Sequence, residues 1–207
     1  MTGTARTGPV YVVDDDDALR DALRFLLESA GYSAETFAEA EQFLAVPRLA
    51  PGSCIILDVR MPGMSGIELQ HELARRGSIL PIIFLTAHGD VPMAVTAVKQ
   101  GAFDFIEKPF EDERLLRLVD EALKLDAAAR ERRARQLTAV ARLDTLTPRE
   151  REVLDCVVAG KLNKRTAEEL GISIKTVEAH RAKLMQKLHV DSTAQLVRLV
   201  IDGHSAR

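Results

Sequence analysis

A small set of polar residues has the side chains needed to transfer a phosphoryl group: carboxylates, a hydroxyl and an ammonium group. These residues lie at the ends of short apolar runs. Carboxylates that converge on one point repel each other unless a cation offsets them, and Mg²⁺ prefers oxygen ligands. With such an ion present, a carboxylate can attack a phosphoryl donor while an ammonium group neutralises the oxygens of the transferring group. The residues in question are Asp14 and Asp15 after the first run, Asp58 after the third, Thr86 after the fourth and Lys108 after the fifth.

Asp58 is the nucleophile we favour, because it stands alone at its strand end and precedes the loop VRMPGMSG, which can bring backbone groups close. Lys108 would supply a fixed positive charge, and the Thr86 hydroxyl could reach toward a phosphate. The alternative is structural, since consecutive aspartates can cap a helix and offset its dipole, and we favour it for Asp16 and Asp17. A surface lysine and a loop hydroxyl are the corresponding alternatives for Lys108 and Thr86.

These residues are connected by a pattern that predicts a flavodoxin-like α/β fold, a doubly wound sheet of five parallel strands. Ligands of such sheets bind beyond the carboxyl ends of the strands, near the point where strand order reverses, so the polar residues should share one edge. The expected strands are 10–13, 32–37, 54–57, 82–85 and 103–106, and the expected helices are 18–30, 38–46, 66–76, 91–100 and 112–123.

The remaining chain predicts a helical linker followed by four helices. Residues 126–143 lack Gly and Pro and are rich in Ala, Arg and Leu, which favours a helix. Thr147, Pro148 and Glu150 form the pattern of a capping box, so a helix should run to about residue 158. We expect Asn163 to cap a second helix, Ser173 to cap a third over 174–188, and residues 192–201 to form a fourth. The short turn 171–173 makes the second and third helices a helix-turn-helix.

The third of these helices has one apolar side and one side suited to a DNA groove. Ile174, Val177, Leu184 and Leu188 should pack inward. On the other side, small Ala179 and Ala182 allow close approach to base edges, and Glu178 can accept from a cytosine amino group. Phosphate contacts are expected from Lys164, Arg165, Lys175, Thr176, His180, Arg181 and Lys183. The alternative is a solvated charged helix, which is also our interpretation of the linker arginines 130, 132, 133 and 135.

Charge divides between the two parts of the chain. Residues 1–126 carry 12 Lys and Arg against 21 Asp and Glu, a net −9, whereas residues 127–207 carry a net +6. The longest charge-free stretch, 77–89, is too short to span a bilayer, and the first ten residues lack an apolar signal segment. We therefore expect a cytoplasmic protein without a membrane partner. Cys54 and Cys156 are expected to be buried free thiols without a function.

The motifs YVVDDDDALRDALRFLL, IILDVRMPGMSGIEL, PIIFLTAHGDVPMAV and GAFDFIEKPF resemble those of a bacterial two-component receiver domain. The segment LTPREREVLDCVVAGKLNKRTAEELGISIKTVEAHRAKLMQKL resembles the helix-turn-helix output domain of the LuxR/NarL/FixJ group, and the combination most resembles regulators of the FixJ type. We expect a receiver over 9–124, a linker over 125–143 and a LuxR-type DNA-binding domain over 144–207.

The resemblance implies a role for each pocket residue. Asp58 would accept the phosphoryl group, and Asp15 and Asp58 would bind Mg²⁺, or Mn²⁺ in its place, with the backbone carbonyl of Arg60. Asp14 would act on the metal through water. Thr86 would be the switch hydroxyl, Lys108 the contact to phosphate, and Phe105 the switch aromatic, with a core phenylalanine as the alternative for Phe105.

The function expected from this resemblance is that of a response regulator rather than an enzyme. A sensor histidine kinase would phosphorylate it, and the phosphorylated homodimer would bind double-stranded promoter DNA, with RNA polymerase as a further partner and activation as the outcome. One alternative is a regulator that works without phosphate. A Mg²⁺-dependent phosphohydrolase is less favoured, because it needs an aspartate where this chain has Arg60.

Overall fold

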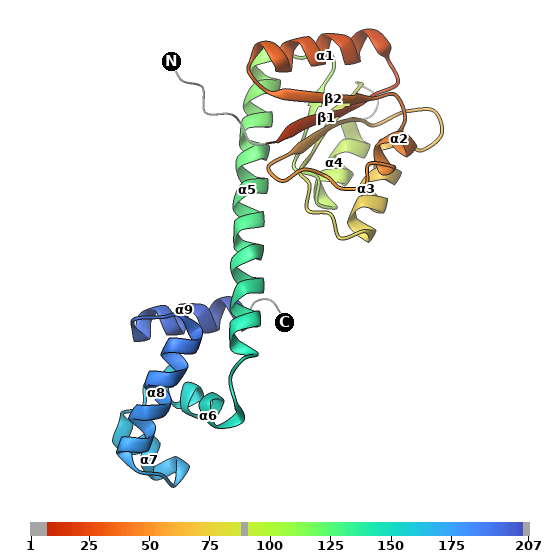
Figure 1. Ribbon diagram of the computed structural model, residues 1–207. Helices are drawn as coiled ribbons and strands as arrows, with labels where there is room; N and C mark the ends of the chain where they lie inside the picture. Colours follow the sequence, from red (N-terminus) through yellow and green to blue (C-terminus); the bar gives the residue numbers. More distant parts are fainter. Residues whose placement is uncertain (1–7, 88–90, 205–207) are drawn as a thin grey trace. The chain divides into compact units, whose positions relative to one another are not determined.

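A parallel sheet is the centre of the first of two units into which the chain divides, residues 1–130 and 131–207 (Figure 1). The computed structural model describes residues 8–87 and 91–204. Strand order in the sheet is β2-β1-β3-β4-β5, which confirms the predicted doubly wound fold. The strands are β1 (Pro9–Val13), β2 (Ser33–Phe37), β3 (Cys54–Asp58), β4 (Ile82–Thr86) and β5 (Asp104–Glu107).

Helices cover both faces of the sheet, because alternate residues of each strand point to opposite sides. Tyr11, Ile55 and Phe84 belong to the core beneath α2, α3 and α4, whereas Ile56 and Ile83 belong to the core beneath α1 and α5 (Figure 1). Both faces of β3 and β4 are therefore buried, which explains their continuous apolar sequences. The helices are α1 (Asp17–Ser29), α2 (Ala40–Leu44), α3 (Gly66–Arg75), α4 (Val91–Lys99) and α5 (Asp112–Leu143).

The strand register brings the carboxyl ends of four strands to one edge of the sheet. Val13 of β1 pairs with Leu57 of β3, so the next residues, Asp14 and Asp58, lie side by side at the carboxyl ends of these strands. Thr86 of β4 pairs with Glu107 of β5, and Lys108 follows at the same edge. The chain passes from β1 to β2 on one side and to β3 on the other, so the two aspartates flank the point where strand order reverses.

Several of the predicted helical segments differ from the observed helices. The helix expected over 38–46 is limited to α2, because Glu39 is extended and occupies the capping position before Ala40, and Ala45 is the cap at the other end. The Ala38 N–H donates to the Gln42 side chain. The segments predicted as a helix over 112–123 and a helical linker over 126–143 form one helix, α5, since neither Gly nor Pro interrupts them. The motif PIIFLTAHGDVPMAV includes residues 88–90, which lie outside the described residues.

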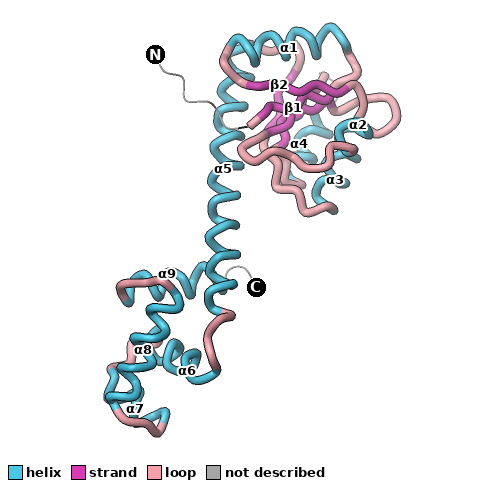
Figure 2. Tube along the Cα trace, in the orientation of Figure 1, coloured by secondary structure: helices cyan, strands magenta, loops and turns pink. Residues whose placement is uncertain are grey.

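In the described part of the second unit, up to residue 204, four helices follow the end of α5, as predicted. Figure 2 shows them as the helical segments at the carboxyl end of the chain. Their shared core includes Val153, Val177, Leu184 and Leu196. The last helix runs past its predicted end at residue 201 and continues to His204. Within this added turn, Gly203 lies so close to α5 that a Cβ atom added to it would stand 2.5 Å from Cδ1 of Leu143. The helices are α6 (Pro148–Val158), α7 (Asn163–Leu170), α8 (Ile174–Leu188) and α9 (Thr193–His204).

Helix starts in this unit largely follow the predicted capping residues. Thr147 and Glu150 form the reciprocal capping box of α6, and the Ser173 hydroxyl accepts from the Thr176 N–H at the start of α8. The prediction for Asn163 is wrong, because Leu162 occupies the capping position of α7 and the Asn163 side chain accepts a hydrogen bond from Arg181 instead. Ile174 was also expected to pack inward but is 46% exposed, because it is the first residue of α8 and lies at the edge of the core.

Two further expectations concern the chain as a whole. Cys54 and Cys156 are buried free cysteines, as predicted. Over residues 8–87 and 91–204, no helix is both long enough and apolar enough to cross a membrane.

Candidate functional site

The Lys108 ammonium joins two carboxylates at the carboxyl edge of the sheet. Its Nζ lies 2.7 Å from Oδ1 of Asp58 and 2.9 Å from Oδ2 of Asp14. Asp14 is 1% exposed and Asp58 is 8% exposed, so both carboxylates are nearly removed from water. The second oxygen of Asp58 accepts the backbone N–H of Arg60 at 3.0 Å. Three of the predicted pocket residues therefore meet, although Lys108 is 94 residues from Asp14 and 50 from Asp58.

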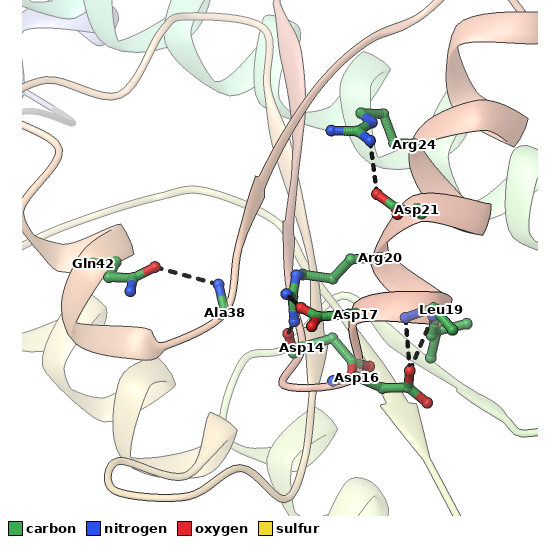
Figure 3. Close-up of polar contacts among 10 residues, drawn as sticks. Asp14, Asp16, Asp17, Leu19, Arg20, Asp21, Arg24, Ala38 and Gln42 are labelled. Atoms are coloured by element: carbon green, nitrogen blue, oxygen red, sulfur yellow. Dashed lines mark hydrogen bonds and ion pairs between the residues drawn. The ribbon is translucent and has the colours of Figure 1, made fainter.

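The start of α1 holds Asp14 in place (Figure 3). The Asp16 N–H donates to Oδ1 of Asp14 at 2.9 Å, and Nη1 of Arg20 donates to the Asp14 carbonyl at 2.6 Å. Asp17 pairs with Arg20, and the Asp16 carboxylate accepts from the N–H groups of Ala18 and Leu19, as the capping interpretation predicted (Figure 3). Sequence reasoning missed Arg20, whose only local signal was its position three residues after Asp17.

Burial and charge act against each other in this pocket. Burial raises the pKa of the Asp58 carboxyl, and the charge of Asp14 raises it further. The hydrogen bond and charge of Lys108 lower it, but the pKa remains above its usual value. Burial lowers the pKa of Lys108, but its hydrogen bonds to Asp58 and Asp14 outweigh burial and leave that pKa raised. The raised pKa of Asp58 means that its ionised form is disfavoured in this pocket, and a further cation close by would stabilise that form.

Three of the predicted pocket residues make other contacts. Asp15 is exposed, and it lines a groove at the same edge with Glu39, Glu41, Pro62 and Gly63, among others. The Thr86 side chain is fully buried, and its hydroxyl donates to the Ala87 carbonyl at 3.1 Å. Phe105 is half-buried and packs against the core on the α3 and α4 side of the sheet.

The chemistry of the pocket fits a hard divalent cation. The side chains that could bind one are carboxylates, whose oxygens Mg²⁺ and Mn²⁺ favour, and Mg²⁺ commonly binds through one or two carboxylates while it keeps several waters. In the part of the chain that the structure describes, no three His, Cys, Asp or Glu side chains are grouped closely enough to hold a metal. A cation at Asp58 would therefore depend on water and backbone oxygens for its remaining ligands.

The second unit presents a charged surface along α7 and α8. Val177, Leu184 and Leu188 are buried, so the opposite side of α8 faces outward, as predicted. His180 and Arg181 are half-buried, whereas the other predicted contact residues are exposed. The exposed ones are Lys164, Arg165, Lys175, Thr176, Glu178, Ala179, Ala182 and Lys183.

Two protein families match the chain in the order of its two units. Residues 10–120 match the response regulator receiver domain, and residues 144–200 match the bacterial regulatory proteins of the luxR family. The first match contains the Asp14, Asp58 and Lys108 pocket, and the second contains the surface of α7 and α8. A sensor histidine kinase and DNA are the partners that this combination implies.

Similar proteins match both units of the chain. The chain is 46% identical over 195 residues to the transcriptional regulatory protein FixJ of Bradyrhizobium diazoefficiens, which covers 94% of this chain and 95% of the relative. A low-resolution structure of the response regulator StyR has a TM-score of 0.84 and 48% identity, covering 94% of this chain and 98% of that one. Full-length FixJ from B. japonicum has a TM-score of 0.60 and 44% identity, covering 97% and 98%. The chain therefore belongs to the two-component response regulators, transcription regulators that join a receiver domain to a luxR-family DNA-binding domain.

Proposed function

We propose that this protein is switched by phosphorylation of Asp58 and that the phosphorylated form binds promoter DNA as a dimer. The observation that supports the proposal most strongly is the contact of one ammonium group, Lys108 Nζ, with both buried carboxylates at 2.7 and 2.9 Å. A lysine in that position can neutralise the oxygens of a phosphoryl group that arrives at Asp58.

In the proposed reaction, a carboxylate oxygen of Asp58 attacks the phosphorus of a phosphohistidine on the sensor kinase. An O–P bond forms, the N–P bond breaks, and the released imidazole takes up a proton. The Arg60 N–H, which donates to Oδ2 of Asp58, would hold the carboxylate in orientation during the attack. Mg²⁺, or Mn²⁺ in its place, would be held by Asp15, Asp58 and the Arg60 carbonyl, with Asp14 acting through water, and would offset the charge of the transferring oxygens.

Phosphorylation would then change the contacts of Thr86 and Phe105. The Thr86 hydroxyl, which donates to Ala87 in this structure, would turn to the phosphate, and Phe105 would follow it into the space vacated. The altered surface around α4 and β5 would favour receiver dimers, which pair two helix-turn-helix units on DNA half-sites. In this scheme the protein acts in the cytoplasm and activates transcription with RNA polymerase.

The phosphorylation step can be tested with the full chain, acetyl phosphate and Mg²⁺. We expect intact-mass measurements to detect one acid-stable, hydroxylamine-labile phosphoryl group on the wild type and none on Asp58→Asn or in excess chelator. Asp21→Asn is the matched control, because Asp21 is exposed and its carboxylate pairs with Arg24 on the same helix. Full phosphoryl uptake by Asp58→Asn would refute the assignment of Asp58.

The coupling to DNA is tested in the same samples. Light scattering should report dimers, and anisotropy should report tighter promoter binding, only where Asp58 carries the phosphoryl group. Normal uptake without either change would support a regulator that works without phosphate, and steady turnover of a phosphomonoester would support the phosphohydrolase.

A further inference from the structure

Hydrogen bonds restrain both ends of α7: one joins its last turn to the loop before α8, and the other joins its first residue to α8 itself. At the end near the turn, Gly171 adopts a left-handed conformation with φ 65°, and the Ile172 N–H donates to the Ala167 carbonyl at 3.0 Å. At the other end, Nη1 of Arg181 on α8 donates to Oδ1 of Asn163, the first residue of α7, at 2.8 Å. The Asn163 side chain is thus engaged by the neighbouring helix, and α7 begins without a side-chain cap.

Arg181 differs from the other cations of this surface. Arg181 is half-buried and its guanidinium has a partner within the domain. Lys164, Lys175 and Lys183 are exposed, and within the described part of the chain their ammonium groups have no hydrogen-bond or ion-pair partner. A guanidinium held by a neighbouring helix is restricted in the direction in which it can reach, whereas a free lysine can adapt to a phosphate. The contact indicates that the main effect of the Arg181 guanidinium is on the position of α7 and not on a phosphate.

We propose that Arg181 is a positioning residue for DNA recognition, which sets the angle between α7 and α8 through Asn163. This inference rests on the proposed function, in which α8 lies in the major groove. There, contacts to the DNA backbone fix the register in which Glu178, Ala179 and Ala182 reach base edges. The other end of α7 is restrained by α6, where Nη2 of Arg149 donates to the Leu170 carbonyl at 2.6 Å. The Arg181–Asn163 bond therefore restrains the first turn of α7, the end away from the Gly171 turn, against rotation relative to α8.

The proposal separates three roles that Arg181 could have. A positioning residue affects the ratio of specific to non-specific affinity, because a wrong angle costs base contacts and leaves phosphate contacts adjustable. A phosphate contact affects both affinities equally and adds to the salt dependence of binding. A residue needed only for stability changes the unfolding temperature and leaves the ratio unchanged.

The test uses the full chain, a duplex that the wild type selects from a random pool, and a scrambled duplex of the same composition. The variants are Asn163→Ala, Arg181→Gln and the double variant, with Lys183→Gln as the control for a phosphate contact. We expect each single variant to lower the specificity ratio by about five- to tenfold, the scale of one lost hydrogen bond, and the double variant to lower it no further. Asn163→Ala should leave the slope of log affinity against log salt unchanged.

Asn163→Asp provides a rescue, because aspartate keeps an acceptor for Arg181. This variant should retain the wild-type ratio even though its added negative charge lowers both affinities. The inference is overturned if Asn163→Ala retains the ratio, or if Arg181→Gln behaves as Lys183→Gln does. If the wild type selects no duplex from the pool, the proposed function itself is overturned. Thermal unfolding of every variant shows whether a loss of affinity comes from a loss of folding.

Discussion

Single residues in this protein owe their properties to partners that are distant in the sequence. Lys108 would be an ordinary surface lysine without Asp14 and Asp58, and Asp58 would be an ordinary carboxylate without burial. Glu150 shows the same principle in the second unit, where it caps the start of α6 and also accepts a hydrogen bond from Lys187 of α8 at 2.7 Å. Contacts such as these determine how each unit responds to pH.

Glu150 should make the second unit sensitive to acid. The Lys187 ammonium and the Thr147 N–H lower the pKa of Glu150 from its usual 4.5 to about 2. Since the folded pKa is the lower one, the stabilisation is complete above about pH 4.5 and is lost as pH falls toward 2. We expect Glu150→Gln to lower the free energy of unfolding by about 1 to 2 kcal/mol at pH 7, a modest value because Lys187 is partly exposed.

Urea unfolding of the full chain between pH 2 and 7 measures this effect. The difference between wild type and Glu150→Gln should shrink as pH falls through the window from 4.5 to 2. Glu152→Gln is the control, because Glu152 is exposed and its carboxylate pairs with Arg149 on its own helix. A constant difference across the range would show that the charge of Glu150 contributes nothing.

At the scale of elements, α5 is attached to the sheet by a buried carboxylate. Asp126 is fully buried, and its Oδ2 accepts from the Gly52 N–H at 2.7 Å, the Ser53 N–H at 3.3 Å and Nε of Arg130 at 2.6 Å. Among the described residues, its Oδ1 has no hydrogen-bond partner. The bonded loop leads into β3, so Asp126 fixes the amino end of the strand whose carboxyl end carries Asp58.

Removal of this carboxylate should loosen the start of β3. We expect Asp126→Ala to lower the stability of the first unit by about 2 to 4 kcal/mol, because two buried N–H groups and a guanidinium lose their acceptor. The adjacent Cys54 reports local opening, since burial, with a contribution from the Asp126 charge, raises the pKa of its thiol to about 12 and keeps it unreactive.

Thiol labelling followed by peptide mass measurement should show faster modification of Cys54 in Asp126→Ala than in the wild type. Glu121→Ala is the control on the same helix, because Glu121 is exposed, and should change stability by less than about 0.5 kcal/mol. Equal labelling of Cys54 in all three proteins would show that Asp126 does not hold the loop.

At the scale of the whole molecule, the division of charge corresponds to two different tasks. The net −9 of residues 1–126 includes the carboxylates around Lys108, whereas the net +6 of residues 127–207 includes the exposed cations of α7 and α8. The protein is therefore close to neutral as a whole while one part of it is suited to a polyanion.

Phosphorylation should increase the salt dependence of DNA binding. Lys164, Arg165, Lys175 and Lys183 of one chain predict a slope of log affinity against log salt of about −3 to −4, and a dimer about twice that. Anisotropy titrations between about 50 and 200 mM salt, with and without acetyl phosphate, measure both slopes. The same slope in both conditions would contradict pairing of the DNA-binding units, and Asp58→Asn should keep the smaller slope throughout.

The elements and the general location of the pocket could be predicted from the sequence because their signals are local. The apolar runs of β3 and β4, the capping box at Thr147 and the Gly171 turn each depend on residues a few positions apart. The expectation that Asp58 and Lys108 share one edge followed from the general rule for parallel sheets. The prediction failed for the capping role of Asn163 and the burial of Ile174, which both depend on how α7 and α8 pack.

Only the tertiary structure decided which polar groups become partners. Nothing near Asp126 in the sequence indicates that it will accept hydrogen bonds from residues 74 and 73 positions away, and nothing near Arg181 indicates Asn163. The reason is physical: helices and strands are determined by backbone hydrogen bonding and periodicity, whereas a buried polar side chain must pair with whichever distant group packing leaves unsatisfied.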